Sequence, residues 1–170
     1  MKRRFDLPFL HAWDPSRYAE GYLRSGILEE EVQLQVLAQL RQLGCIAFPI
    51  DVGSKNLRGK AYGALAAAGR QDLYFRLAGN TGAGMKGISD VIGVSPTGRA
   101  IFIEVKKPAL YVPEGKEGRL IVKDGGEAGT PTDDQLLFLA NVHRSGAIAG
   151  VVWSSLDCFN VYRDQTREAA

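Results

Sequence analysis

The chain has 170 residues, which matches one compact domain and leaves little room for a second. Its 45% hydrophobic and 24% charged residues are typical of a soluble globular protein whose core needs no disulfides. The formal net charge of +2 is too small to indicate nucleic acid by itself. There is no run of signal-peptide or transmembrane length, so we expect no membrane association and a cytoplasmic protein.

The first quarter of the chain contains one clear helical pattern. Residues 1–26 carry scattered aromatic side chains and are predicted to pack on the domain as an irregular arm. Residues 27–43 predict a helix that Ser25 is placed to cap. Its buried stripe follows helical spacing: Val32, Val36, Leu40 and Leu43. Residues 45–50 then predict a short buried strand.

Cys45 and Cys158 are the only cysteines, and each lies beside apolar residues. We expect two buried, reduced thiols and no metal or redox site at them.

Residues 51–88 form a long glycine-rich stretch, with one short helix expected near residues 61–68. Structureless segments of this length are uncommon unless they are functional or mobile. The stretch contains six basic side chains with Asp72 as the one acid between them: Lys55, Arg58, Lys60, Arg70, Arg76 and Lys86. Such a stretch can lie along phosphates, although on charge alone a solvated surface loop is the simpler interpretation.

The clearest local pattern is a hairpin, with strands predicted at residues 90–94 and 99–105. Between them, Pro96 suits the second position of a type I turn and Gly98 the left-handed position that follows. This combination predicts a three-residue loop with a bulge at the glycine. A two-residue turn would shift the register by one.

The predicted turn determines which side chains meet. Ser95 pairs with Arg99, and stepping outward along both strands brings Asp90 opposite Glu104, with Cβ atoms about 4.5–5.5 Å apart. Lys106 shares the face of Glu104, because alternate residues of a strand point the same way. The opposite face suits a core, since it carries Ile101, Ile103 and Val105.

The second half of the chain completes a mixed α/β pattern. Residues 107–131 are predicted to form an inserted hairpin or flap. Residues 132–145 predict a helix that opens with a capping box between Thr132 and Gln135. A strand, a short closing element and a tail follow at residues 148–153, 156–162 and 163–170. This order of elements predicts one mixed α/β domain.

Asp90 and Glu104 would repel each other at this separation unless a cation neutralises them. A few hard oxygen ligands that leave room for water suit Mg²⁺. Such an ion can polarise a phosphoryl oxygen, and Lys106 can orient or deprotonate a water or balance phosphate charge. The two carboxylates, the ion and the lysine therefore suit hydrolysis of a phosphodiester. The alternative interpretation is that Glu104 and Lys106 form an exposed charge pair and that Asp90 is a turn residue.

At this point the chain resembles a known superfamily. Gly87-Ile88-Ser89-Asp90, then Ile103-Glu104-Val105-Lys106, then Gln135 opening a helix resemble the motifs of PD-(D/E)XK nucleases. The acidic helix start at residues 29–33 and the segment 146–152 make the chain similar to the VRR-NUC family. The similarity spans roughly residues 27–155. It implies a restriction-endonuclease-like core, a mixed central sheet flanked by helices, with residues 27–162 as the nuclease domain.

The resemblance also implies roles for individual residues. Asp90 and Glu104 would bind the metal together with the carbonyl of Val105, and Lys106 would be the catalytic lysine. Gln135 would lie near the site, although the capping box explains this glutamine equally well.

The family further places a glutamate on its first helix. Here Glu29 shares the inward face of Val32 and Val36, whereas Glu30 and Glu31 suit the helix N-terminus.

These expectations describe a Mg²⁺-dependent deoxyribonuclease in which Mn²⁺ can substitute. Compact members of the resembled family act as homodimers on branched DNA, so we expect a homodimeric phage or bacterial endonuclease acting on Holliday-junction-like DNA. Two alternatives stay open: a DNA-binding module of the same fold that does not cut, and an exonuclease or end-processing enzyme.

Overall fold

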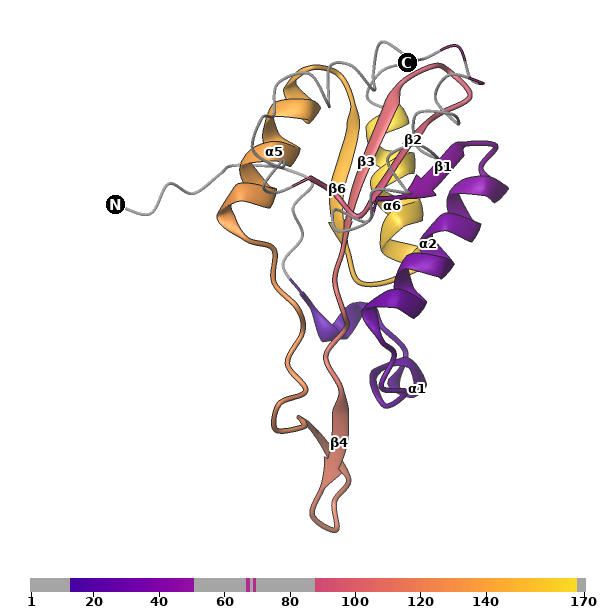
Figure 1. Cartoon of the computed structure of the whole chain (residues 1–170). Helices are drawn as coiled ribbons and strands as arrows, with labels where there is room; N and C mark the ends of the chain where they lie inside the picture. The colour runs from indigo at the N-terminus through magenta and orange to yellow at the C-terminus, as the bar shows by residue number, and fades with distance from the viewer. Residues whose placement is uncertain (1–12, 51–66, 68, 70–87, 168–170) are drawn as a thin grey trace.

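A mixed β-sheet lies at the centre of the computed structural model, which describes residues 13–50, 67, 69 and 88–167 (Figure 1). In this part of the chain the sheet has four strands in the order β1-β2-β3-β6. Their bounds are Ile46–Pro49 (β1), Val91–Val94 (β2), Ala100–Val105 (β3) and Ile148–Val152 (β6). β1, β2 and β3 pair antiparallel, and β3 and β6 pair parallel.

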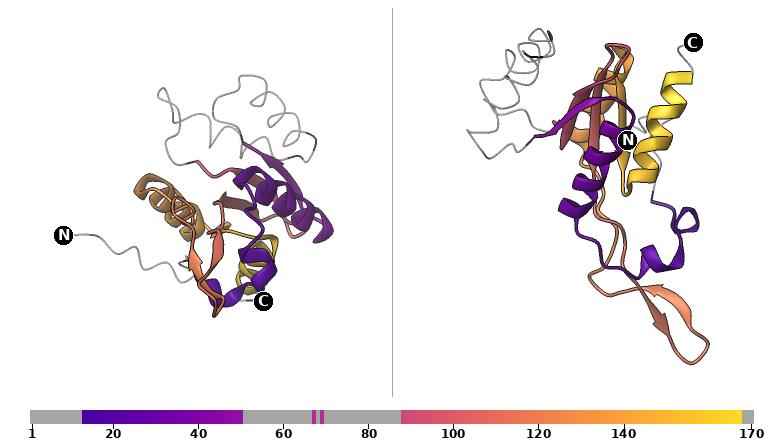
Figure 2. Two further views of the ribbon diagram at one scale, coloured as in Figure 1. Left: turned by 90° about the horizontal axis from the view of Figure 1, so that it is seen from below. Right: turned by 90° about the vertical axis from the view of Figure 1, so that its right-hand side faces the viewer.

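Helices cover both faces of this sheet. α2 (Glu29–Gln42) and α6 (Ser155–Arg167) pack on one face, and α5 (Asp133–Arg144) packs on the other, as the left view of Figure 2 shows. The alternation of side chains along β3 explains the two layers. Ile101, Ile103 and Val105 face α2 and α6, whereas Phe102 faces α5. The predicted mixed α/β sheet flanked by helices is therefore confirmed.

The first long helix has the predicted buried stripe but a different start. Val32, Val36 and Leu40 are fully buried. The expected cap by Ser25 is wrong, because the Ser25 hydroxyl donates to the carbonyl of Tyr22 at 2.6 Å. Leu28 is the N-cap residue, and its backbone N–H donates to the Glu31 carboxylate at 2.8 Å.

The predicted register of the β2–β3 hairpin is confirmed. Val94 pairs with Ala100 and Val91 pairs with Ile103. In the turn, the N–H of Gly98 donates to the carbonyl of Ser95 at 2.9 Å, and Gly98 has the predicted left-handed φ of 82°. The turn chemistry therefore places the ends of both strands as the sequence predicts.

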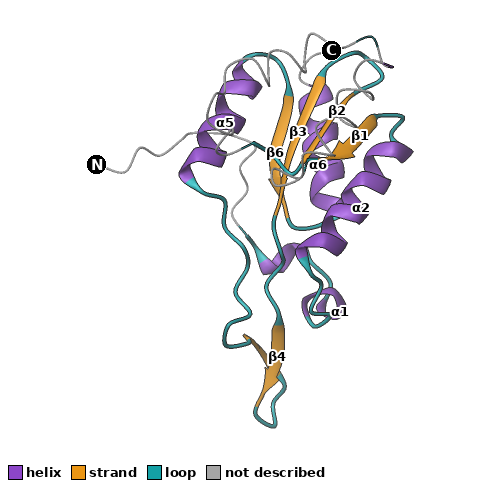
Figure 3. Cartoon of the chain, in the orientation of Figure 1, coloured by secondary structure: helices purple, strands orange, loops and turns teal. Residues whose placement is uncertain are grey.

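The predicted insertion at residues 107–131 is a hairpin in the structure. Its strands are β4 (Tyr111–Glu114) and β5 (Arg119–Val122), which pair antiparallel. Along the chain they follow β3 and precede α5. Figure 3 shows this hairpin projecting away from the central sheet. The first limb leaves the end of β3, and on the returning limb the N–H of Gly129 donates to the carbonyl of Lys107 at 2.9 Å.

Residues 13–25 pack on the domain as an ordered segment. They contain a 3₁₀ helix, η1 (Pro15–Arg17), and a short helix, α1 (Glu20–Leu23). Tyr18 stacks between Trp13 and Tyr22, with ring centroids 4.5 Å and 5.3 Å away. The Tyr22 hydroxyl donates to the carbonyl of Trp153 at 2.5 Å, which ties the segment to the end of β6.

The C-terminal helix is longer than the sequence predicts. α6 continues to Arg167, where a tail was expected from residue 163. The reason is a tertiary contact: buried Gln165 accepts from the Ala149 N–H at 3.0 Å and donates to the Ala149 carbonyl at 2.7 Å. These bonds extend the order of the helix over residues that the local pattern leaves as a tail.

The two cysteines lie in the core of the domain. Cys45 and Cys158 are buried and free, as expected, and burial raises the pKa of Cys158 to about 12.

None of the described helices has the length and apolar character needed to cross a membrane. The short helix expected near residues 61–68 lies almost wholly outside the described residues.

Candidate active site

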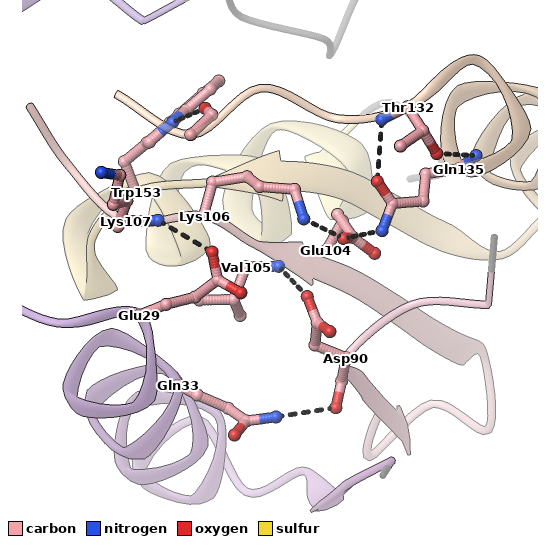
Figure 4. Close-up of polar contacts among 11 residues, drawn as sticks. Glu29, Gln33, Asp90, Glu104, Val105, Lys106, Lys107, Thr132, Gln135 and Trp153 are labelled. Atoms are coloured by element: carbon pink, nitrogen blue, oxygen red, sulfur yellow. Dashed lines mark hydrogen bonds and ion pairs between the residues drawn. The ribbon is translucent and has the colours of Figure 1, made fainter. Parts of the chain in front are cut away.

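The residues singled out in the hairpin meet at one end of the sheet (Figure 4). Asp90 directly precedes β2, and Glu104 lies near the end of β3, which stops one residue before Lys106. The Asp90 carboxylate accepts a 2.8 Å hydrogen bond from the backbone N–H of Val105. Asp90 therefore lies across from Glu104, as the predicted register requires.

Glu104 is fully buried. Its Oε1 accepts from the Lys106 ammonium at 2.5 Å and from the side-chain amide of Gln135. Its Oε2 has no hydrogen-bond partner among the described residues. Burial, and next the nearby Asp90 carboxylate, raise the pKa of Glu104 to about 8 against the lowering effect of Lys106. Glu104 therefore ionises less readily than a free carboxyl group, because burial and the second acid both oppose its negative charge.

Lys106 is nearly buried, with 9% of its surface exposed. Its backbone N–H donates to the carbonyl of Val152 at 2.9 Å, which continues the parallel pairing of β3 with β6. Its ammonium stays on the face of Glu104, as alternation along a strand predicts. The predicted Glu–Lys pair is thus an interior pair, and the interpretation as an exposed surface pair is wrong.

Gln135 combines the two roles that the sequence left as alternatives. Its Oε1 accepts from the backbone N–H of Thr132 at 2.8 Å, which completes the capping box of α5. Its Nε2 donates to Glu104. One amide therefore both closes the helix start and orients the buried carboxylate.

Glu29 points from α2 toward the end of β3 (Figure 4). It accepts from the backbone N–H of Lys107 at 3.2 Å, and its side chain is solvent-exposed. Its contact with Lys107 agrees with the predicted side of α2, but Glu29 is exposed and does not share the burial of Val32 and Val36. Glu30 is exposed, and Glu31 caps the helix, as the sequence predicts for an acidic helix start.

Gln33 was not singled out in the sequence, yet it contacts the site. Its Nε2 donates to the backbone carbonyl of Asp90 at 3.0 Å, and the Ile50 N–H donates to the same oxygen at 2.7 Å. The available signal was its spacing, because Gln33 lies one helical turn after Glu29 and on the same side of α2.

The donor set can be compared with the needs of a metal ion. Among the described residues, no group of three or more His, Cys, Asp or Glu side chains is arranged to hold one. Two carboxylates, Asp90 and Glu104, are present, and one carboxylate oxygen is buried without a partner. The N–H and C=O of a strand residue point to the same side, so the Val105 carbonyl is directed toward Asp90. Two carboxylates, a carbonyl and waters fit Mg²⁺, which keeps several waters.

The six basic residues predicted to contact DNA lie outside the described residues: Lys55, Arg58, Lys60, Arg70, Arg76 and Lys86. Their role stays a prediction. Comparison of the chain with protein-family models, curated proteins and solved structures found no match.

Proposed function

We propose that this chain is a Mg²⁺-dependent DNA endonuclease whose active site contains Asp90, Glu104 and Lys106. The observation that carries the proposal is Glu104, a fully buried carboxylate with one oxygen unpartnered among the described residues and a second acid beside it. A buried polar atom without a hydrogen-bond partner is costly, and such atoms are normally paired or bind a metal. Acids arranged in this way cluster at functional sites.

Each residue would have a distinct task. Asp90, Glu104 and the Val105 carbonyl would hold the ion. When bound, the ion would polarise a phosphoryl oxygen of the substrate and make a nearby water more acidic. Lys106 places positive charge beside Glu104, where its ammonium can hydrogen-bond a phosphate oxygen or the attacking water. Gln135 holds Glu104 in place through its amide.

The substrate and assembly are proposed from the resemblance to VRR-NUC nucleases. The described part of the chain contains one such acid–lysine site, so cutting two strands of a Holliday-junction-like DNA would take two chains. We therefore propose a homodimer acting on branched DNA in the cytoplasm of a bacterium or a phage-infected host, with Mn²⁺ able to replace Mg²⁺. The basic residues 55–86 would lie along the phosphates.

The test is cleavage of labelled junction, flap, duplex, single-stranded and closed circular DNA with Mg²⁺, Mn²⁺ or EDTA. We expect metal-dependent cutting that Glu104→Gln and Lys106→Met abolish, with DNA binding kept. Glu117→Gln, an exposed acid in the turn of the projecting hairpin, is the matched control.

The other outcomes are equally informative. Cutting of linear but not circular DNA would replace the endonuclease with an exonuclease. Tight DNA binding without cutting under any metal would favour a binding module of this fold.

A further inference from the structure

The side chain of Lys106 is covered by the returning limb of the 107–131 insertion. The N–H of Gly129 donates to the carbonyl of Lys107 at 2.9 Å, which brings the two limbs together beside the lysine. A Cβ added at Gly129 would lie 3.3 Å from the Cβ of Lys106 and 3.4 Å from its Cδ. The first distance is tighter than ordinary van der Waals contact and the second lies at its limit, so the Lys106 side chain fits in its present position because residue 129 has no side chain.

Gly129 is itself held from the other side by Trp153. The indole Nε1–H of Trp153 donates to the carbonyl of Gly129 at 2.9 Å. Trp153 is a firm anchor, because it is 98% buried and its backbone N–H donates to the carboxylate of Asp157 at 3.1 Å. Its ring also packs against Trp13, with ring centroids 6.1 Å apart.

We propose that Gly129 and Trp153 form a latch that fixes the direction of the Lys106 side chain. This inference rests on the proposed nuclease function, in which Lys106 is catalytic. Gly129 and Trp153 act through Lys106 and are therefore positioning residues. Neither belongs to the motifs that identify the acids and the lysine.

The latch also explains how the insertion relates to the site. The same limb continues from Gly129 to Thr132 and Gln135, and Gln135 donates to Glu104. One short segment therefore holds Lys106 at one end and Glu104 at the other. The projecting β4–β5 hairpin is continuous with this segment.

Gly129→Ala is the sharpest probe, because position 129 does not have a left-handed φ and alanine there adds a methyl group without backbone strain. The lysine stem must then shift by a few tenths of an ångström. We expect kcat to fall about tenfold with KM for DNA unchanged, since small misplacements of a reacting group slow chemistry without weakening binding. Gly21→Ala in α1 is the matched control, because the added methyl group meets nothing within 4 Å.

Trp153→Phe provides a second variant that keeps an aromatic ring and removes the indole donor. We expect the same loss of kcat at constant KM, and a melting temperature of the folded protein close to that of the wild type would separate this loss from unfolding. Wild-type kcat in both Gly129→Ala and Trp153→Phe would overturn the latch.

A readout that does not need activity keeps the latch and the nuclease function apart. With ¹³C-labelled lysine, the Cε signal of Lys106 is the one missing in Lys106→Met. We expect this signal to move in Gly129→Ala and to stay in place in Gly21→Ala. A wild-type protein that cuts no DNA would refute the function while the signal still reports on the latch; an unmoved signal would refute the latch whatever the activity.

Discussion

The backbone N–H of Val105 donates a 2.8 Å hydrogen bond to Oδ2 of Asp90, across the open end of the β2–β3 hairpin. Asp90 lies just outside β2, where the backbone pairing of the two strands ends. Its side chain, in place of a backbone carbonyl, accepts the hydrogen bond from the Val105 N–H. Its carbonyl is held as well, by Gln33 and Ile50. The carboxylate of Asp90 is thus oriented by the fold before any ligand arrives, which lowers the cost of binding one.

Divalent cations should stabilise the folded protein through Asp90 and Glu104. At a Mg²⁺ concentration ten times Kd, we expect a gain of about 1.4 kcal/mol in the free energy of unfolding, since the ion binds the folded state alone. Thermal melts in Mg²⁺ and in EDTA measure it. Asp90→Asn and Glu104→Gln should lose the shift, whereas Glu117→Gln should keep it. An equal shift in all four proteins would place the ion elsewhere.

Removing the amide of Gln33 should weaken metal binding without unfolding the protein. Gln33→Ala leaves the Asp90 carbonyl with its bond from Ile50 but releases the link to α2. Partners of this kind typically change metal affinity about 10–100-fold, and we expect the lower end here. Isothermal titration with Mn²⁺ gives the affinity. Gln35→Ala, an exposed glutamine on the same helix, is the control; equal affinities in the two variants would deny Gln33 a part in the site.

Thr132→Ala and Gln135→Ala separate the two roles of Gln135. Thr132→Ala removes the hydroxyl that accepts from the Gln135 N–H at 3.3 Å, so it should cost about 1 kcal/mol of stability and leave cleavage nearly unchanged. Gln135→Ala should also lower kcat, because Glu104 loses an amide donor. Urea unfolding and single-turnover cleavage measure the two effects. If both variants cut at the same rate, capping alone accounts for Gln135.

Gln165 should matter for stability but not for chemistry. Its amide satisfies both the N–H and the carbonyl of Ala149 on β6. Gln165→Ala leaves these buried groups unpaired, at a cost of about 2–4 kcal/mol. Chemical unfolding measures the loss against Gln42→Ala, an exposed glutamine at the end of α2. A loss no larger than that of the control would mean that water replaces the amide.

Tyr22 predicts a dependence of stability on alkaline pH. Burial, and next the charge of Asp157, raise the pKa of Tyr22 from its ordinary 10 to about 12. The hydroxyl therefore contributes fully below pH 10, and this contribution is lost as the pH rises toward 12, because the unfolded chain ionises first. At pH 8 we expect Tyr22→Phe to be about 1 kcal/mol less stable than the wild type.

The comparison is urea unfolding of the two proteins at pH 8, 9.5 and 11, with Tyr111→Phe in the projecting hairpin as a control for the loss of one tyrosine. The difference between wild type and Tyr22→Phe should shrink with pH. A constant or growing difference would show that the Tyr22 hydroxyl is not held in its protonated form by the fold.

Much of the site geometry could be predicted from the sequence, because it depends on one turn. Pro96 and Gly98 select the loop type, and the loop determines the register of the hairpin. The register and the alternation of side chains along a strand then place three residues on one face: Asp90, Glu104 and Lys106. The position of Glu29 was predicted from the helical spacing of its neighbours. These are local rules, in which residues close in sequence restrict one another.

Long-range contacts decided the rest. The sequence of residues 1–26 did not indicate that Tyr22 would hydrogen-bond to Trp153. The sequence of residues 163–170 did not indicate that Gln165 would bond to Ala149 and so extend α6. Ser25 turned away from the helix start because Leu28 and Glu31 supply the cap.

The sequence by itself determined the mixed α/β order, the hairpin register and the meeting of two acids with a lysine, because turn chemistry and periodicity act over a few residues. Only the tertiary structure decided that Glu104 is buried with an unpartnered oxygen. Only it brought Gln33 to Asp90, Gly129 to Lys106, and Trp153 to Gly129. Burial and contact between distant segments depend on how helices and the insertion pack on the sheet, and no local pattern specifies that packing.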